Sequence, residues 1–281
     1  MDYFRPLSIE EALGLAQQPG RLFLAGGTDL SLHMREGRIN PLGLIDLGKI
    51  AELKEIRLEG EWLEIGSMTT FYDLGQSDLI RKQAKALWQA CQTMGSPQIR
   101  HQATIGGNLG NCSPAADGLP PLLALGAEVE LVSARGRERV LLADLLKRTP
   151  LLESGTLIKG FLIPLQGWDS GFAKLGRRQA LAIARLSTAF ALKRQDGVAL
   201  EVRAAFGAVG RRAFLSEPLA QSLSGRVLNE SWLEDAVKGS QNAVAEALGS
   251  RASAPYKRVA VGGVVRQALK TMLGGGNHDG D

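Results

Sequence analysis

Two pairs of adjacent glycines, Gly26-Gly27 and Gly106-Gly107, are the positions of this 281-residue chain best suited to hold a charged ligand. Each pair follows a hydrophobic stretch and is followed by small polar residues. Glycine adopts positive φ and lets a ligand approach the backbone, so that N–H groups can converge on an anion. One such loop indicates a phosphate. Two indicate a pyrophosphate held from both sides, and hence a dinucleotide.

The spacing around the glycines excludes the two commonest nucleotide loops. The first pair follows Ala25 and is neither the G-x-G-x-x-G of Rossmann proteins nor the G-x-x-x-x-G-K-[ST] of nucleoside triphosphatases. Alone, it is more often a tight turn than a phosphate site. The second loop is more specific, because side chains that can bond a polyhydroxyl chain follow it, namely Asn108, Asn111, Ser113 and Asp117. A loop whose Asn and Ser side chains bond its own backbone stays open as an alternative.

No nucleophilic, hydrolytic or metal-binding set accompanies these loops. The histidines, His33, His101 and His278, are scattered, and neither G-x-S-x-G nor H-E-x-x-H occurs in the sequence. The two cysteines, Cys91 and Cys112, are too few to ligate an iron–sulfur cluster or a structural zinc ion. We therefore expect no catalytic residue and no metal site on this chain, and any chemistry would be that of a bound cofactor.

The elements around the glycine pairs are expected to position them after strands. A short strand at 21–24 runs into the first pair, a short helix follows Asp29, and a second strand spans 42–47, which together predict a β-α-β arrangement. The second pair lies in the stretch 94–118, rich in Gly, Asn, Ser and Pro, which predicts a long irregular loop. Such a loop inside a compact domain is usually functional.

The remaining segments predict an α+β protein with a boundary near residues 165–170. Hairpins are expected across Glu59-Gly60-Glu61 and Arg135-Gly136-Arg137. Helices are expected from Asp78 to about Cys91 and from a capping box at Ser231. The other expected elements are a helix at 120–125, strands at 156–164, 172–175, within 183–193 and at 198–209, and a final helix at 256–272.

Composition is that of a soluble globular protein, with 44% hydrophobic and 22% charged residues. The net charge of the chain is +4. The densest basic patches of the sequence are short and lack interleaved aromatic residues; they lie at 135–139, 177–178 and 211–212. We therefore expect no nucleic-acid binding, and solvated loops with contact to an acidic partner as the alternative. The few cysteines and the lack of a signal-peptide core or a membrane-spanning stretch predict a cytoplasmic protein.

Longer motifs around both loops resemble the flavin-binding medium subunits of molybdenum hydroxylases. This family includes the carbon monoxide dehydrogenase medium subunit and the flavin part of xanthine dehydrogenase. The resemblance rests on the runs 22–30, LFLAGGTDL, and 95–117, GSPQIRHQATIGGNLGNCSPAAD. Shorter matches follow at Ile163-Pro164, Phe172-Ala-Lys174 and Tyr256-Lys-Arg258, so that the resemblance covers nearly the whole chain.

The resemblance implies an α+β fold in two domains. The first would be a two-subdomain FAD-binding domain of the vanillyl-alcohol-oxidase (PCMH) type at 1–166, with FAD between subdomains of about 1–52 and 53–166. A domain similar to the CO dehydrogenase flavoprotein C-terminal domain would span 167–273. The polar, Gly-rich residues 274–281 predict a flexible tail.

The resemblance also implies a set of FAD contacts, each carried over onto a matching residue. Lys174 would place a cation near the polar edge of the flavin, where it would stabilise negative charge on the reduced form. The alternative is that Lys174 is a surface lysine on a strand. By role, the set comprises Phe23, Leu24, Ala25, Gly26, Gly27, Thr28, Asp29 and Leu30 for the first pyrophosphate loop; Thr104, Gly106, Gly107 and Asn108 for the second; Ser113 and Asp117 for ribityl or ribose hydroxyls; Ile158 for packing on the flavin; Lys174 for its polar edge; and Gly95, His101 and Asn111 as further residues of the site.

Two departures from the family pattern stand out. His101 occupies a position where an asparagine is expected, which changes the local hydrogen bonding. The inserted loop with four cysteines that some relatives carry for a further cluster is absent, because this chain has two cysteines. That absence argues against the aromatic acyl-CoA reductase branch.

The role implied is that of an electron-transfer subunit of an FAD-dependent oxidoreductase. A large subunit with the molybdopterin cofactor would oxidise the substrate. A small subunit would carry electrons through iron–sulfur clusters to the FAD of this chain, which would pass them to NAD⁺ or a quinone. The assembly would be a heterotrimer that could itself dimerise. Two alternatives remain: a stand-alone FAD-dependent reductase of the same fold, like the enolpyruvyl-sugar reductases, and a non-redox scaffold subunit.

Overall fold

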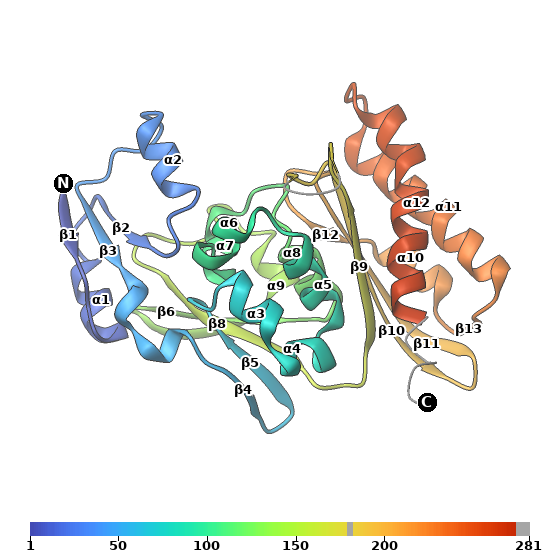
Figure 1. Cartoon of the computed structure of the whole chain (residues 1–281), viewed down its shortest axis with the longest axis horizontal. Coiled ribbons are helices and arrows are strands. Elements are labelled where there is room, and N and C mark those ends of the chain that lie inside the picture. Colours follow the sequence, from blue (N-terminus) through green and yellow to red (C-terminus); the bar gives the residue numbers. More distant parts are fainter. Residues whose placement is uncertain (179–181, 274–281) are drawn as a thin grey trace. The chain divides into compact units, whose positions relative to one another are not determined.

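The computed structural model describes residues 1–178 and 182–273, and it confirms the predicted α+β fold class (Figure 1). The C-terminal segment 274–281, for which the sequence predicts a flexible tail, lies outside the described residues. The chain folds into two compact units, each built from separate stretches of sequence. Unit 1 comprises Met1–Ser77, Ser96–Cys112 and Gly126–Pro164, whereas unit 2 comprises Asp78–Gly95, Ser113–Leu125 and the chain from Leu165 onward.

The N-terminal part of unit 1 is the predicted β-α-β arrangement around the first glycine pair. Strands β1 (Asp2–Phe4), β2 (Arg21–Leu24) and β3 (Gly43–Asp46) form a parallel sheet in the order β1-β3-β2. Helix α1 (Ile9–Leu15) begins at Ser8, whose hydroxyl accepts a hydrogen bond from the N–H of Glu11. Helix α2 (Leu30–Arg35) directly follows the first glycine loop.

A five-stranded antiparallel sheet forms the rest of the unit 1 framework and contains both predicted hairpins. Its order is β4-β5-β8-β6-β7. The buried side chains Ile45, Leu53, Met68 and Leu157 pack in a core between the parallel strands and this sheet. Two short 3-10 helices, η1 (Leu47–Lys49) and η2 (Ala51–Leu53), and helices α3 (Phe71–Gln76) and α9 (Leu142–Leu145) complete this framework. The strands are β4 (Ile56–Glu59), β5 (Trp62–Gly66), β6 (Glu128–Ser133), β7 (Gly136–Leu141) and β8 (Leu157–Pro164).

The prediction of a long irregular loop at 94–118 is wrong. The stretch contains two helices, α6 (Pro97–Gln102) and α7 (Ile105–Asn111). Each helix begins at a hydroxyl residue: Ser96 accepts from the N–H of Ile99, and Thr104 accepts from the N–H of Gly107. Glycine weakens an isolated helix by about 1 kcal/mol per residue. Capping and contacts with distant segments offset that cost here.

Unit 2 is a mostly antiparallel sheet with helices on both faces (Figure 1). The strands pair in the order β12-β11-β10-β9, with β13 on β11. Side chains alternate along β9 (Asp169–Leu175). Ser170 accepts a hydrogen bond from the N–H of Ala86 in α5 (Lys85–Thr93), while Gly171 lies against α12 (Ala254–Leu273) on the opposite face. Among the described helices, none is both long and apolar enough to cross a membrane. The strands are β9 (Asp169–Leu175), β10 (Leu186–Gln195), β11 (Val198–Gly207), β12 (Phe214–Leu215) and β13 (Arg226–Val227).

Two details of the unit 2 helices differ from the sequence expectations. The single helix expected from Asp78 is two helices, and the predicted capping box at Ser231 is wrong, because Asn229 caps that helix by accepting from the N–H of Trp232. The buried indole of Trp232 then donates to the carbonyl of Leu223, which fixes the helix on its neighbour. The helices are α4 (Asp78–Gln83), α5 (Lys85–Thr93), α8 (Leu119–Ala124), α10 (Glu217–Leu223), α11 (Glu230–Leu248) and α12 (Ala254–Leu273).

The contact between β9 and α12 leads to a stability prediction. A Cβ atom on Gly171 would lie 2.3 Å from the carbonyl oxygen of Ala268, so Gly171→Ala should lower the free energy of unfolding by about 1–3 kcal/mol. The matched control is Gly263→Ala on the open side of α12, where a Cβ meets nothing within 4 Å. The control should be neutral or stabilising by about 0.5–1 kcal/mol. Urea unfolding followed by circular dichroism measures both, and equal midpoints would contradict the packing argument.

Candidate functional site

The first glycine loop joins β2 to α2 in unit 1. Gly27 has φ +71°, which glycine adopts without strain. Its carbonyl accepts from both the backbone N–H and the hydroxyl of Ser31, at 3.0 and 2.6 Å, so the turn is held from the helix side. Gly26 is required for a different reason, because a Cβ there would lie 1.8 Å from the carbonyl oxygen of Gln102.

The same loop carries a run of unpaired backbone donors. Over the described residues, no hydrogen bond is donated by the backbone N–H groups of Gly26, Gly27, Thr28, Asp29 or Leu30. Buried or half-buried N–H groups are nearly always paired in folded proteins, so a successive run of free ones at a half-buried loop is unusual. Such a run of N–H groups is suited to phosphate oxygens.

The second glycine pair lies in the first turn of α7 and uses its backbone groups differently. Gly106 donates to the carbonyl of Ser67 at 2.8 Å, and Gly107 donates to the hydroxyl of Thr104 at 3.0 Å. A Cβ on Gly106 would lie 2.5 Å from the Cβ of Ser67. This pair is therefore anchored within the fold, whereas the first loop supplies the free donors.

The structure brings the two glycine pairs together within unit 1. Gly26 lies against the backbone of Gln102, which is two residues before Thr104, the residue that caps α7. A Cβ on Gly107 would come within 3.5 Å of the Cβ of Ala25. Behind them, the buried Ile158 of β8 places its Cδ1 atom 3.9 Å from the Cβ position of Gly110 on the same helix. Segments far apart in the sequence thus form one surface.

Sequence reasoning missed the segment Ser67–Thr70, which holds α7 in place. Its backbone accepts hydrogen bonds from Ile105 and Gly106, and Thr70 forms a β-bridge with Thr104. In the described part of the chain, the buried hydroxyls of Ser67 and Thr69 have no hydrogen-bond partner. In the sequence, Ser67-Met68-Thr69-Thr70 indicates no more than the start of a short helix.

The imidazole of His101 stacks on the ring of Tyr72, with centroids 3.8 Å apart and an angle of 27° between the planes. His101 is in the last turn of α6 and is exposed, as is Tyr72. The departure from asparagine at this position therefore adds an aromatic contact between α6 and α3.

In unit 2, Asp117 and Lys174 form a buried ion pair. Their side chains are 7% and 8% exposed, and Lys174 Nζ lies 2.5 Å from Asp117 Oδ2 and 3.3 Å from the carbonyl oxygen of Ala182. The alternative of a surface lysine is therefore wrong. Burial raises the pKa of Asp117, and the nearby Lys174 ammonium only partly opposes that rise. Among the described residues, Asp117 Oδ1 has no hydrogen-bond partner and remains free to accept a hydroxyl.

The other expected site residues lie near the ends of helices. Asn108 and Asn111 are on α7, which ends at Cys112 in the left-handed conformation with φ 47°. In unit 2, Gly95 has φ +45°, and the Ser113 hydroxyl accepts from the N–H of Ala115, so part of the polar stretch does bond its own backbone.

The glycine loops and the α+β fold define a dinucleotide-binding protein, and comparison with family models narrows the class. The family described as "FAD binding domain in molybdopterin dehydrogenase" matches residues 1–166, and the one described as "CO dehydrogenase flavoprotein C-terminal domain" matches residues 171–272. The chain belongs to this family of FAD-binding subunits of molybdopterin dehydrogenases. The predicted family, the FAD cofactor and the oxidoreductase class are thereby confirmed.

Individual relatives agree with the family match over almost the full chain. The chain is 32% identical to the nicotinate dehydrogenase FAD-subunit of Eubacterium barkeri, covering 97% of this chain and 96% of the relative. It is 31% identical to the carbon monoxide dehydrogenase medium chain of Afipia carboxidovorans, covering 96% and 95%. The solved structure of reconstituted CO dehydrogenase from Oligotropha carboxidovorans matches with a TM-score of 0.88 and 30% identity, over 97% of each chain.

The donor sets described above fit the chemistry of FAD. The free N–H groups of the first loop can bond oxygens of a diphosphate, which carries negative charge. The unused Oδ1 of Asp117 can accept a hydrogen bond from a sugar or ribityl hydroxyl. The chain therefore supplies an anion cradle and a hydroxyl acceptor, which are two of the groups that this cofactor requires.

Thr104 gives a prediction for the second loop. Thr104→Val removes the oxygen that accepts from Gly107 and should cost about 1 kcal/mol of stability, with weaker FAD retention. Thr104→Ser keeps the oxygen and should retain both properties. Urea unfolding and the FAD fluorescence released on ultrafiltration measure the two effects. Equal behaviour of the Val and Ser variants would show that the hydroxyl does not hold this turn.

The buried ion pair gives a pH-dependent prediction. Lys174→Met leaves the Asp117 carboxylate buried without its partner, which should cost about 3 kcal/mol near neutral pH. The pKa of Asp117 is raised in the folded state, so its protonated carboxyl favours folding. The stability that Asp117 contributes is therefore present at low pH and is lost as pH rises through the folded-state pKa. The deficit against wild type should therefore be smaller at about pH 5 than at about pH 8.

Two comparisons test this interpretation by urea unfolding at both pH values. The double variant Asp117→Asn, Lys174→Met should recover most of the loss, since no charge is then buried. Lys82→Met, at an exposed position of α4, should leave stability unchanged. A Lys174→Met deficit that does not vary with pH would argue against a buried, ionised Asp117.

Proposed function

We propose that this chain is the FAD-carrying electron-transfer subunit of a molybdenum-containing hydroxylase or dehydrogenase. It receives electrons from iron–sulfur clusters of a partner subunit and passes them to an acceptor such as NAD⁺ or a quinone. The observation that carries the proposal is the run of unpaired N–H groups from Gly26 to Leu30, packed against the capped first turn of α7. The names of relatives, "FAD-subunit" and "medium chain", support a role as one part of a larger enzyme.

The chain's own residues bind and orient the cofactor in this proposal. The first loop, Phe23 to Leu30, donates its free N–H groups to the diphosphate. Thr104 holds Gly107 in a turn that lets the cofactor approach Asn108, and Ile158 supplies an apolar surface for the ring system. Bound FAD supplies the ability to accept and release electrons singly or in pairs.

Polar residues that follow the second glycine pair, together with Lys174, are also assigned to the cofactor in this proposal. Asp117 and Ser113 accept from or donate to hydroxyls of the ribityl or ribose chains. Lys174, held by Asp117, provides positive charge for the polar edge of the flavin, and the pairing limits how much of that charge is uncompensated. The further residues proposed for the site are Gly95, His101 and Asn111.

An electron relay needs no acid–base machinery on this chain. The sequence contains three histidines, and the structure places His101 in an aromatic stack with Tyr72. A substrate-oxidising site would need a positioned acid or base. In the proposed assembly, a large molybdenum subunit performs that step and a small iron–sulfur subunit links it to this chain.

The proposal includes the assembly and the domain organisation. The three subunits form a cytoplasmic heterotrimer, which could dimerise. The FAD-binding PCMH-type domain corresponds to residues 1–166, with subdomains of about 1–52 and 53–166. The CO dehydrogenase flavoprotein C-terminal-like domain corresponds to 167–273, with 274–281 as a tail. The extents of the two family matches, 1–166 and 171–272, support these limits.

The visible absorption spectrum of the purified complex tests the proposal. Wild type should show bound FAD, and Gly107→Leu should lose it, because the space beside Gly107 is closed by Thr104 and Ala25. Gly14→Leu is the matched control, since a Cβ on Gly14 meets nothing within 4 Å. Circular dichroism establishes that both variants are folded.

Three results would contradict the proposal. A wild-type complex without FAD would exclude a flavin role. A monomeric chain that reduces a substrate directly with NADPH would indicate the stand-alone reductase. Full activity of a Gly107→Leu complex that lacks FAD would indicate a scaffold.

A further inference from the structure

Three segments of unit 2 that are distant in sequence end at the same edge of its sheet. Strand β9 ends at Leu175, β10 begins at Leu186 and β11 ends at Gly207. Because the three strands are antiparallel neighbours, these ends lie side by side. The start of α12 joins them, since Lys257 Nζ donates to the carbonyl of Ala208 at 2.5 Å.

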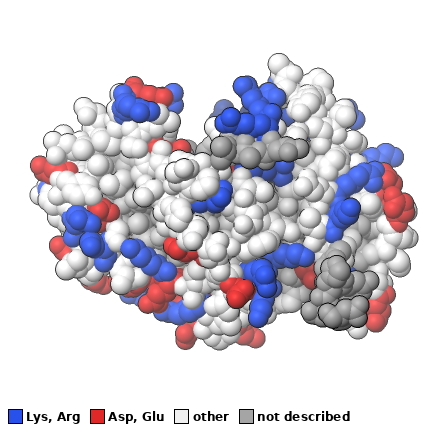
Figure 2. Space-filling view, viewed as in Figure 1, with Lys and Arg blue, Asp and Glu red and all other residues white. Residues whose placement is uncertain are grey.

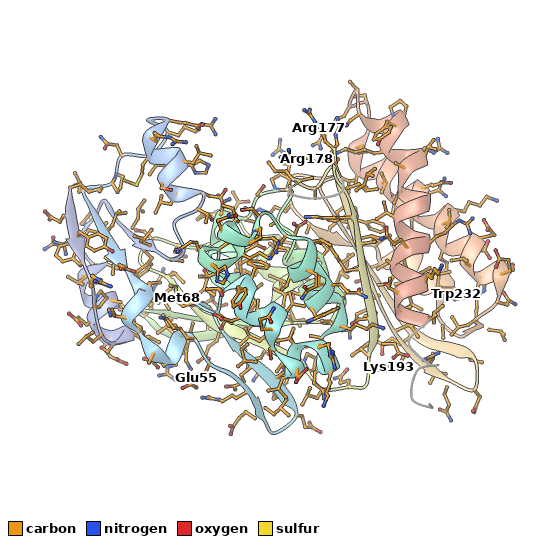
Figure 3. All side chains as sticks on the ribbon, in the orientation of Figure 1. Glu55, Met68, Arg177, Arg178, Lys193 and Trp232 are labelled. Atoms are coloured by element: carbon orange, nitrogen blue, oxygen red, sulfur yellow. The ribbon has the colours of Figure 1, made fainter. Side chains whose placement is uncertain are left out.

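Basic residues gather at this edge, and we refer to them as the cationic patch. Figure 2 shows Lys and Arg side chains collected there, and Figure 3 places Arg177 and Arg178 at this end of β9. Two of the basic pairs that stand out in the sequence, 177–178 and 211–212, belong to the patch. Its members are Arg177, Arg178, Arg185, Arg211, Arg212, Arg251, Lys257 and Arg258.

The cations of the patch lie close to one another and hold backbone carbonyls. Arg251 donates to the carbonyl of Val209 at 3.5 Å, and the Arg185 guanidinium lies 5.8 Å from the ring centre of Tyr256. Partial burial lowers the pKa of Lys257, and repulsion from Arg185 and Arg251 lowers this pKa further. Like charges at close range repel one another and destabilise the isolated chain. A partner that carries negative charge would relieve this repulsion.

Six residues of the cationic patch differ from basic residues elsewhere in unit 2, because no ion pair with a carboxylate is found for them in the described part of the chain. Arg194, Arg226 and Arg266 each form an ion pair with a nearby acid. In contrast, within the described residues no carboxylate forms an ion pair with Arg177, Arg185, Arg211, Arg251, Lys257 or Arg258. Negative charge is therefore expected to come from another molecule.

Apolar side chains within the patch indicate what kind of molecule that is. Ile183 is 81% exposed, Tyr256 53% and Val259 73%. Exposed aromatic and aliphatic groups among arginines are typical of the contact surface of a protein partner, in which Arg and Tyr are enriched. A phosphate group alone would leave these apolar groups in water.

We propose that the cationic patch is a docking surface for the acidic face of a partner protein of the same complex, with Tyr256 and Val259 as its apolar centre. The inference rests on the proposed function, which supplies the complex. Complementary charge steers association and fixes orientation, and its effect weakens as salt screens it. The patch thus serves assembly, whereas the glycine loops serve the cofactor.

The test measures association of the FAD-loaded chain with its co-produced partner subunits by analytical ultracentrifugation at increasing NaCl. Arg177→Glu, Arg211→Glu and Arg258→Glu together should weaken association about ten-fold or more at low salt. Tyr256→Ala with Val259→Ser should weaken it at all salt concentrations. The matched control is Lys82→Glu, Lys238→Glu and Lys270→Glu, which gives the same change in net charge at exposed positions of unit 2 outside the patch.

Each outcome decides for or against the proposal. Salt-sensitive wild-type association, weakened by the patch variant and not by the control, supports it. Wild-type association that does not respond to salt, or patch and control variants that behave alike, would overturn it. Loss of NADH binding by the patch variant with normal association would instead indicate a nucleotide site, and loss of self-association alone would indicate a second copy of this chain. FAD content, read from the same samples, reports separately on the proposed function.

Discussion

The glycine-loop surface depends on one backbone contact, in which Gly26 lies directly against the carbonyl of Gln102. No side chain fits between them, so the loop after β2 and the turn before α7 are fixed by main-chain atoms rather than by adjustable side chains. Because the N–H groups of α7 are consumed by Ser67, Thr69 and Thr104, the helix acts as a rigid support. The free donors lie on the neighbouring loop, which is where a ligand can use them.

Unit 2 carries charge in two different settings. The Asp117–Lys174 pair is buried on the sheet face covered by α8, and the carbonyls at the end of β11 are held by Lys257 and Arg251. Burying ions is costly unless each has a partner. The pair is balanced internally, whereas Arg177, Arg211 and Arg258 have no carboxylate partner among the described residues. Charge that stabilises the fold is thus distinct from charge that is exposed.

The sequence predicted the elements whose signals are local and missed those set by distant contacts. Strands β2 and β3 and the hairpins follow from apolar runs and turn residues, and the motif at 95–117 identified the family. Helix α7 was not predicted, because its glycines suggest a loop and the segment that stabilises it, Ser67–Thr70, lies far away in sequence. Helix α6 lies in the same stretch, rich in Gly, Asn, Ser and Pro, and was missed with it. The burial of Lys174 also depends on Asp117 and could not be inferred from its own neighbours.

The division of the chain between the two units has a genetic consequence. Helices α5 and α8 precede residue 166 in the sequence, yet they pack on strands that follow it, and α4 packs on α5. A gene fragment cut at that point would separate the sheet of β9, β10 and β11 from the helices that cover one of its faces. Such a fragment would expose the sheet face that α5 and α8 cover, so residue 166 does not mark the limit of an independently folding piece of this chain.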